Sequence, residues 1–211
     1  MDRALLIIMA KWHAYGRCKT RLAIDIGKSN SAKVQSVMTK HTISVAKSLE
    51  KTKLIHIYMA ISGLREKNCK RWSKELGIEN FNLQGKGCLG EKMKRQIIIN
   101  KKFCTQKKIK NIIFIGTDLP DLCHLDLINT MKELKQNDLI LGPSNDGGYW
   151  LIGLSEKIIS KHLHLPFINI KWSKENVLQN TINNFASRKL KYKFLEEKID
   201  IDNVIDIENR K

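Results

Sequence analysis

Asp118 follows a short apolar run at a point where its carboxylate could do chemistry. Residues 112–115 are uniformly apolar and are closed by Gly116, a pattern that predicts a strand buried on both faces of a parallel sheet. Because Pro120 cannot continue a strand, the chain must turn and leave Asp118 at the carboxyl end, where open α/β sheets bind ligands. Hard carboxylate oxygens in such a place suit a divalent cation that holds phosphates. The alternative is that Asp118 caps the following turn or helix.

A cationic segment follows the first apolar run, residues 4–9 (ALLIIM), which predicts the first strand. A flexible cationic loop after a strand can cradle an anion. It matches neither a P-loop nor a GxGxxG fingerprint, so a solvated basic loop is the competing interpretation. Residues 10–22 contain four cations and a glycine suited to a tight turn, namely Lys11, Arg17, Lys19, Arg21 and Gly16.

Residues 141–154 (LGPSNDGGYWLIGL) predict two strands joined by a turn at Asp146-Gly147-Gly148. A simple hairpin would explain both glycines. The functional interpretation is that glycines beside Tyr149 let a substrate approach the backbone closely. In that interpretation Asp146 is the candidate general base.

The last acidic residues of the chain alternate with isoleucine. The segment KIDIDNVIDIENRK contains Asp200, Asp202 and Asp206. The alternation predicts either an edge strand with one solvated face or a second metal-binding carboxylate.

Strands and helices are expected to alternate along the chain. We expect a helix from Ser29 or Ser31 to about residue 50, and Glu91 and Ser173 at the N-termini of later helices. This alternation predicts one three-layer α/β/α domain over residues 1–211, and the strand pair within 141–154 predicts an antiparallel member in a mostly parallel sheet. Strands are expected at 4–9, 54–61, 81–84, 112–115, 138–141, 149–154 and 192–195, and the other helices at 66–76, 91–104, 125–136, 155–162 and 174–186.

Composition narrows the classes of protein. The formal charge of +17 attracts nucleic acid, anionic membranes or phosphorylated small molecules. The lysines are scattered and accompany no nucleic-acid-binding signature, so specific nucleic-acid binding is not expected. Five cysteines without a CxxC pair indicate a reducing cytoplasm. No apolar run approaches 18 residues, so membrane insertion is not expected, and the N-terminus reads as a strand and not a signal peptide.

Six motifs together resemble a known family: GRCKTRL (16–22), LGEKM (89–93), IGTDLPDL (115–122), LGPSNDGGYWLIGL (141–154), KWS (171–173) and DIDNVID (200–206). In this order they resemble the DUF2064 family of GT-A-fold, nucleotide-diphospho-sugar-transferase-like proteins. Members are often described as glycosyltransferases, some associated with arsenosugar biosynthesis. The loop and the DLP strand end are also similar to 2-phospholactate guanylyltransferase and, more distantly, to molybdenum cofactor guanylyltransferase. The chain has Asn203-Val204 where the family usually has Thr-Pro.

The resemblance implies a Rossmann-like GT-A fold and transfer from a nucleotide-activated donor, above all a nucleotide sugar, to a small-molecule acceptor. Asp118 and Asp202 would hold Mg²⁺ or Mn²⁺ against the diphosphate. The residues that would bind the nucleotide phosphates are Lys11, Gly16, Lys19 and Arg21, and those that would face the acceptor or donor sugar are Asp146, Gly147, Gly148 and Tyr149.

Two other functions remain open. A nucleotidylyltransferase would use the same residues but release pyrophosphate. A basic nucleic-acid-binding module would bind random duplex in a salt-dependent way and would not need Asp118.

Overall fold

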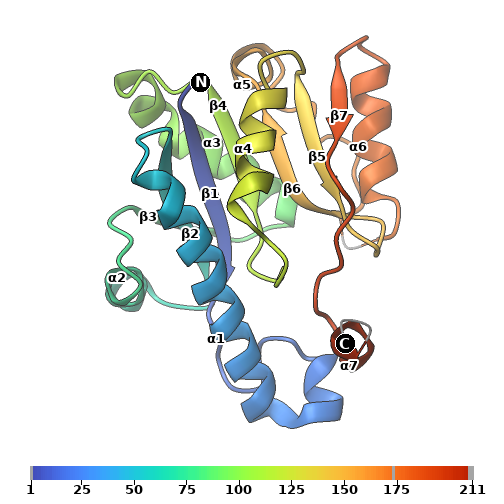
Figure 1. Cartoon of the computed structure of the whole chain (residues 1–211). Helices are drawn as coiled ribbons and strands as arrows, with labels where there is room; N and C mark the ends of the chain where they lie inside the picture. Colours follow the sequence, from blue (N-terminus) through green and yellow to red (C-terminus); the bar gives the residue numbers. More distant parts are fainter. Residues whose placement is uncertain (1, 173, 209–211) are drawn as a thin grey trace.

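The computed structural model describes residues 2–172 and 174–208. A seven-stranded sheet in the order β3-β2-β1-β4-β6-β5-β7 forms its centre (Figure 1). Strand β6 is antiparallel to β4 and β5, and the other neighbours are parallel, as the sequence predicted. The strands are β1 (Ala4–Lys11), β2 (Ile55–Ser62), β3 (Phe81–Leu83), β4 (Asn111–Ile115), β5 (Leu139–Pro143), β6 (Tyr149–Leu154) and β7 (Tyr192–Phe194).

Helices pack against both faces of the sheet (Figure 1). Successive strand side chains point to opposite faces, so in β1 Leu6 and Ile8 enter one core while Leu5 and Ile7 enter the other. The first core includes side chains of α1 (Leu22–Glu50), α2 (Glu66–Glu75) and α4 (His124–Glu133). The second includes those of α3 (Leu89–Gln106), α5 (Glu156–Lys161) and α6 (Val177–Ala186). All five residues of β4 are buried, which confirms the two-sided burial expected of the apolar run.

The expected start of the first helix was wrong. Helix α1 begins at Leu22, and Gly27 interrupts it with φ 83° and ψ 157°. A glycine accepts this left-handed conformation without a Cβ clash, so the chain bends there and re-enters the helix. Ser31 is buried, and its hydroxyl donates to the Lys28 carbonyl at 3.1 Å, so it does not act as an N-cap.

Two later helix starts had been expected at particular residues. In α3, the backbone N–H of Cys88 donates to the Glu91 carboxylate at 2.8 Å, as expected of a first-turn acid. Helix α6 begins at Val177, later than the expected residue 174. The expected N-cap Ser173 lies outside the described residues.

The edge strand considered for the C-terminal segment is not formed. Beyond an isolated bridge between Ser144 and Lys198, the segment runs irregularly into the short helix α7 (Val204–Glu208). The alternation fails to make a strand because Ile201 is buried in a small separate cluster with Leu22 and Met38 of α1. This cluster fixes the C-terminal segment beside the start of α1. None of the described helices is long and apolar enough to cross a membrane.

Candidate functional site

A cleft of about 1170 Å³ opens at the edge of the sheet where β4 and β5 end and β6 begins. The strand order turns back between β1 and β4, and such switch points are where open α/β sheets bind ligands. The cleft is bordered by the turn after β4, the turn between β5 and β6, Trp172 together with residues 174–177, and the C-terminal segment. Its charged lining residues are Arg21, Asp118, Asp146, Lys174, Glu175, Asp200 and Asp202.

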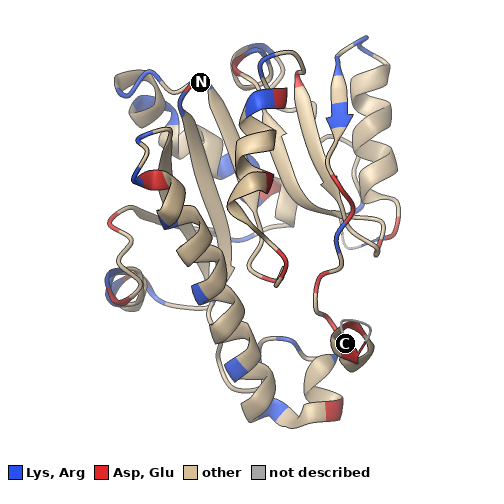
Figure 2. Cartoon of the chain, in the orientation of Figure 1, with Lys and Arg blue, Asp and Glu red and all other residues tan. Residues whose placement is uncertain are grey.

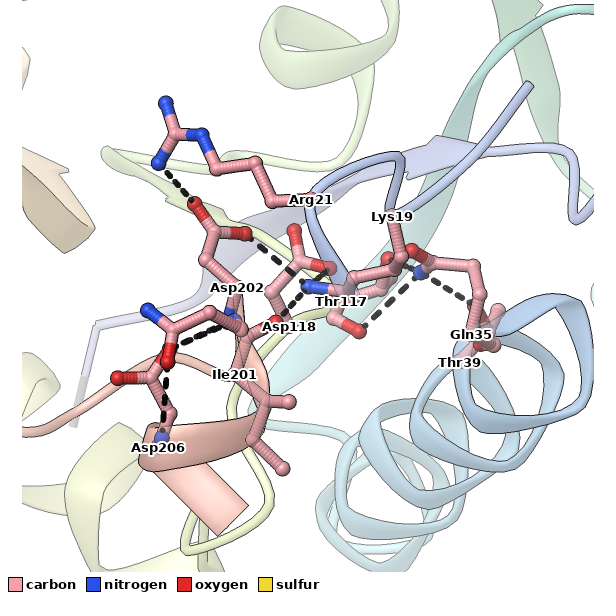
Figure 3. Close-up of polar contacts among 10 residues, drawn as sticks. Lys19, Arg21, Gln35, Thr39, Thr117, Asp118, Ile201, Asp202 and Asp206 are labelled. Carbon is pink, nitrogen blue, oxygen red and sulfur yellow. Dashed lines mark hydrogen bonds and ion pairs between the residues drawn. The ribbon is translucent and has the colours of Figure 1, made fainter. Parts of the chain in front are cut away.

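The two predicted metal ligands, Asp118 and Asp202, meet at this cleft although they lie far apart in the chain. The ammonium of Lys19 lies 2.5 Å from Oδ1 of Asp118 and 3.5 Å from Oδ1 of Asp202 (Figure 3). Both carboxylates remain accessible, with side chains 42% and 41% exposed, whereas the Lys19 side chain is 3% exposed. The structure therefore assembles an acid pair above a buried cation.

The other predicted phosphate-binding residues differ in whether they line the cleft. Arg21 lines the cleft, and its 75% exposed side chain places a guanidinium nitrogen 3.4 Å from Oδ2 of Asp202. Lys11 is exposed at the end of β1, and Gly16 forms a left-handed turn with φ 67°. Neither Lys11 nor Gly16 belongs to the cleft lining described above.

The turn between β5 and β6 is held by Asp146. Its Oδ1 accepts hydrogen bonds from the Ser144 hydroxyl at 2.6 Å and from the Gly148 backbone N–H at 2.9 Å. The left-handed glycine of this turn is Gly147, with φ 79°. A Cβ at Gly147 would overlap the backbone carbonyl of Glu175, so this glycine is required for close packing of the two loops.

Aromatic side chains line the same side of the cleft. The ring of Tyr149 packs edge-on against Trp172 with centroids 6.4 Å apart. Burial raises the pKa of the Tyr149 phenol, which stays neutral and acts as an apolar surface with a buried hydroxyl. Gly90 lets Trp172 approach α3, because a Cβ there would lie 2.5 Å from the indole.

Several contributors were not anticipated as site residues. Glu175 lines the cleft, yet nothing in its local sequence marks it for a particular role. The buried Gln35 donates from Nε2 to the Thr117 hydroxyl at 3.1 Å and so braces the turn that carries Asp118 (Figure 3). The sequence motif around Thr117 indicated a site, but Gln35 could not be predicted from it, because Gln35 belongs to a helix far away in the sequence.

The carboxylates of the cleft outnumber its cations. Burial, followed by the neighbouring charges of Asp146, Asp202 and Asp118, raises the pKa of Asp200 to about 6. This crowding is relieved by a cation, and hard carboxylate oxygens suit Mg²⁺ or Mn²⁺. Within residues 2–172 and 174–208, no three acidic, histidine or cysteine side chains are grouped as a ready-made metal site. Asp118 and Asp202 would hold such a metal, which would supply positive charge to neutralise the acids and to bind ligand phosphates.

The chain belongs to the DUF2064 family, described as "Uncharacterized protein conserved in bacteria", whose model matches residues 45–174. The matched region contains Asp118 and the Asp146 turn, while Lys19, Arg21 and Asp202 lie outside it. No curated protein sequence matches the chain.

Solved structures share the fold over nearly the whole chain. A candidate nucleotide-diphospho-sugar transferase from Desulfovibrio desulfuricans G20 is 24% identical with a TM-score of 0.82, over 98% of this chain and 85% of its own. A cytidylyltransferase from Leptospira borgpetersenii is 11% identical with a TM-score of 0.61, over 100% and 85%. Glucosyl-3-phosphoglycerate synthase from Mycobacterium tuberculosis, in complex with Mn²⁺, UDP and glucosyl-3-phosphoglycerate, is 10% identical with a TM-score of 0.59, over 99% and 75%. At these identities the likeness concerns the fold alone.

Proposed function

We propose that this protein is a metal-dependent transferase of the GT-A type that uses a nucleotide-activated donor and transfers a glycosyl group to a small-molecule acceptor. The observation that carries the proposal is the meeting of Asp118 and Asp202 beside Arg21, at the switch point of the sheet. Two accessible carboxylates next to an exposed guanidinium suit a metal-bound diphosphate, since the acids take the metal and the guanidinium takes phosphate oxygens.

Asp118 and Asp202 would hold Mg²⁺ or Mn²⁺, and Arg21 would contact the donor phosphates. When bound, the metal supplies electrostatic stabilisation of the negative charge that develops on the leaving phosphate. Lys11 and Gly16 remain predicted contributors to nucleotide binding, although neither is among the residues that line the cleft.

The acceptor would lie against the turn between β5 and β6. Gly148 lines the cleft without a side chain, and the rings of Tyr149 and Trp172 would supply an apolar surface. Asp146 is exposed, and hydrogen bonds within the turn occupy its Oδ1, which leaves Oδ2 to accept a proton from the acceptor.

Proteins of this fold support the proposal by example. The Mycobacterium tuberculosis synthase is named with Mn²⁺ and UDP bound, and the Desulfovibrio desulfuricans protein is named for nucleotide-diphospho-sugars.

Nucleotidyl transfer is the second candidate. The exposed cations Lys11, Arg17 and Arg21 favour it, because a nucleoside triphosphate carries more negative charge than a sugar diphosphate. The products distinguish the reactions: glycosyl transfer releases a nucleoside diphosphate or monophosphate, and nucleotidyl transfer releases pyrophosphate.

A thermal-shift screen of nucleotides and nucleotide sugars, with and without Mn²⁺, tests the proposal. A ligand at 100 times its Kd raises the unfolding free energy by about 2.7 kcal/mol, and roughly 2–4 °C of Tm follow from each kcal/mol for a chain of this size. We expect a metal-dependent rise with at least one nucleotide. Absence of any rise across the screen, together with salt-dependent duplex binding that Asp118→Asn leaves unchanged, would favour a nucleic-acid-binding module instead.

A further inference from the structure

The ammonium of Lys19 has its donors directed at protein acceptors. It contacts Oδ1 of Asp118 at 2.5 Å, Oδ1 of Asp202 at 3.5 Å and, in addition, the backbone carbonyl of Ile201. An ammonium has three N–H donors, so these three acceptors occupy it fully and leave no donor for a phosphate.

The burial of the Lys19 side chain also indicates that Lys19 does not bind a phosphate in the cleft. Its side chain is 3% exposed, whereas those of Asp118 and Asp202 are 42% and 41% exposed. Lys19 also lies outside the set of residues that line the cleft, in contrast to Arg21 of the same segment. A cation beside two carboxylates reduces their mutual repulsion, and the other oxygen of Asp202 faces the Arg21 guanidinium at 3.4 Å.

The C-terminal segment is held at two points, one a contact with the rest of the chain and the other a contact within the segment itself. At one, Lys19 holds Ile201 and Asp202, and the Ile201 N–H donates to the Asp118 carbonyl at 3.0 Å. At the other, Oδ2 of Asp206 accepts the N–H groups of Asp202 and Asn203 at 2.8 and 2.9 Å (Figure 3). Oδ1 of Asn203 accepts the Asp206 N–H at 3.1 Å, which completes a reciprocal cap at the start of α7. The Asn at 203 thus provides the cap for which the family usually has Thr.

The backbone of Lys19 is unusual as well. Its φ of 46° lies in the left-handed region, which residues other than glycine rarely adopt. Such a conformation persists where surrounding contacts over-determine it. The three contacts of the ammonium are contacts of that kind.

We propose that Lys19 is a positioning residue that joins the C-terminal segment to the end of β4 and thereby brings the carboxylates of Asp118 and Asp202 together at the cleft, where both would hold the metal. In this proposal the buried ammonium of Lys19 holds the two carboxylates in place, and Arg21 is the residue that binds the phosphates. The part of the proposal that concerns metal rests on the proposed function. The part that concerns docking of the C-terminal segment does not depend on the proposed function.

Hydrogen exchange of residues 199–208 tests the docking without any activity assay. In Lys19→Met, we expect exchange of this segment, including the Ile201 amide, to accelerate at least tenfold while β1 and β4 keep their protection. Mn²⁺ affinity, measured by electron paramagnetic resonance, should fall at least tenfold. Lys33→Met is the matched control, because Lys33 is an exposed lysine of α1 outside the site, and it should change neither quantity.

Asp206→Asn is the second variant, needed if Lys19→Met does not fold. Asp206 caps α7 and lies outside the cleft lining, and its carboxylate accepts the Asp202 N–H, so its substitution should disturb the position of Asp202. We expect faster exchange of residues 199–208 and weaker Mn²⁺ binding here too. Unchanged exchange in both variants would overturn the proposal, and so would tighter Mn²⁺ binding in Lys19→Met, because Lys19 would then only compete with the metal. Wild-type protein that does not bind Mn²⁺ but loses segment protection in Lys19→Met would refute the proposed function and retain the docking role.

Discussion

Two adjacent glycines of the β5–β6 turn should respond differently to the same added methyl group. Gly147 has φ 79°, and a Cβ there would overlap the backbone carbonyl of Glu175. The left-handed conformation costs an alanine about 1–2 kcal/mol, and overpacking against a fixed neighbour costs about 1–3 kcal/mol more. We therefore expect Gly147→Ala to lower the free energy of unfolding by roughly 2–5 kcal/mol, or roughly 4–20 °C in Tm for a chain of this size.

Gly148 has no such backbone constraint. A Cβ there would lie 3.0 Å from Oδ1 of Asp146 and 3.3 Å from the Ser144 hydroxyl, both on side chains that can shift. The cost of Gly148→Ala should stay below about 1 kcal/mol. The methyl group would nevertheless displace the Asp146 carboxylate and occupy space where the acceptor is proposed to lie. Loss of transfer is therefore expected at nearly normal stability.

Calorimetric melting, nucleotide affinity and transfer rate of both variants provide the measurement. Gly147→Ala should melt early and lose all ligand binding together at temperatures where it unfolds. Gly148→Ala should melt and bind nucleotide normally but transfer slowly. The reasoning is refuted if both variants melt alike, or if cooling restores transfer in Gly148→Ala, because the turn would then have a purely structural role.

Three further predictions concern single side chains. Asp118→Asn should abolish metal-dependent nucleotide binding in calorimetry with the fold intact, and unchanged affinity with Mn²⁺ would remove Asp118 from the metal site. Arg21→Ala should weaken nucleotide binding by about 1.5–3 kcal/mol, the scale of a charge-assisted hydrogen bond, and its 75% exposed side chain implies little change in the melting of the ligand-free protein. A large loss of ligand-free stability with normal affinity would instead make Arg21 structural. Burial raises the pKa of the Cys104 thiol to about 11, so iodoacetamide at pH 8 should modify the exposed Cys88 well before Cys104, as followed by mass spectrometry. Equal rates would contradict the burial of Cys104.

The local pattern of apolar residues was sufficient to predict most strands of the sheet. The apolar run at 112–115 and the proline at 120 predicted a two-sided buried strand with Asp118 at its end, and both features depend on short-range sterics and burial. The same reasoning failed at Gly27, because a break inside a helix depends on how its two pieces pack. It also failed for the C-terminal segment, where Ile201 is buried against α1 and not against a neighbouring strand.

The two cations of the KTRL motif show why roles within the site are harder to predict than its location. Lys19 and Arg21 are two residues apart and share a charge, so composition assigns both to the donor phosphates. The left-handed backbone at Lys19 turns its ammonium inward to the acid pair, while Arg21 extends into the cleft. No local propensity signals that turn, because it is stabilised by acceptors from β4 and the C-terminal segment.

Net charge is a similarly incomplete guide to the ligand. Lysine and arginine residues are spread over most helices, strands and loops (Figure 2). Several acidic residues, in contrast, lie along the C-terminal segment, which contributes to the cleft. The chain carries +17, yet the described cleft contains more carboxylates than cations, as Asp200 with its raised pKa reflects. Under the proposed function, a diphosphate would be attracted to the protein as a whole but repelled within the cleft until a divalent cation neutralised the acids. Metal dependence, more than basicity, is consequently the property that distinguishes a nucleotide transferase from a general polyanion binder, and the Asp118→Asn measurement addresses it directly.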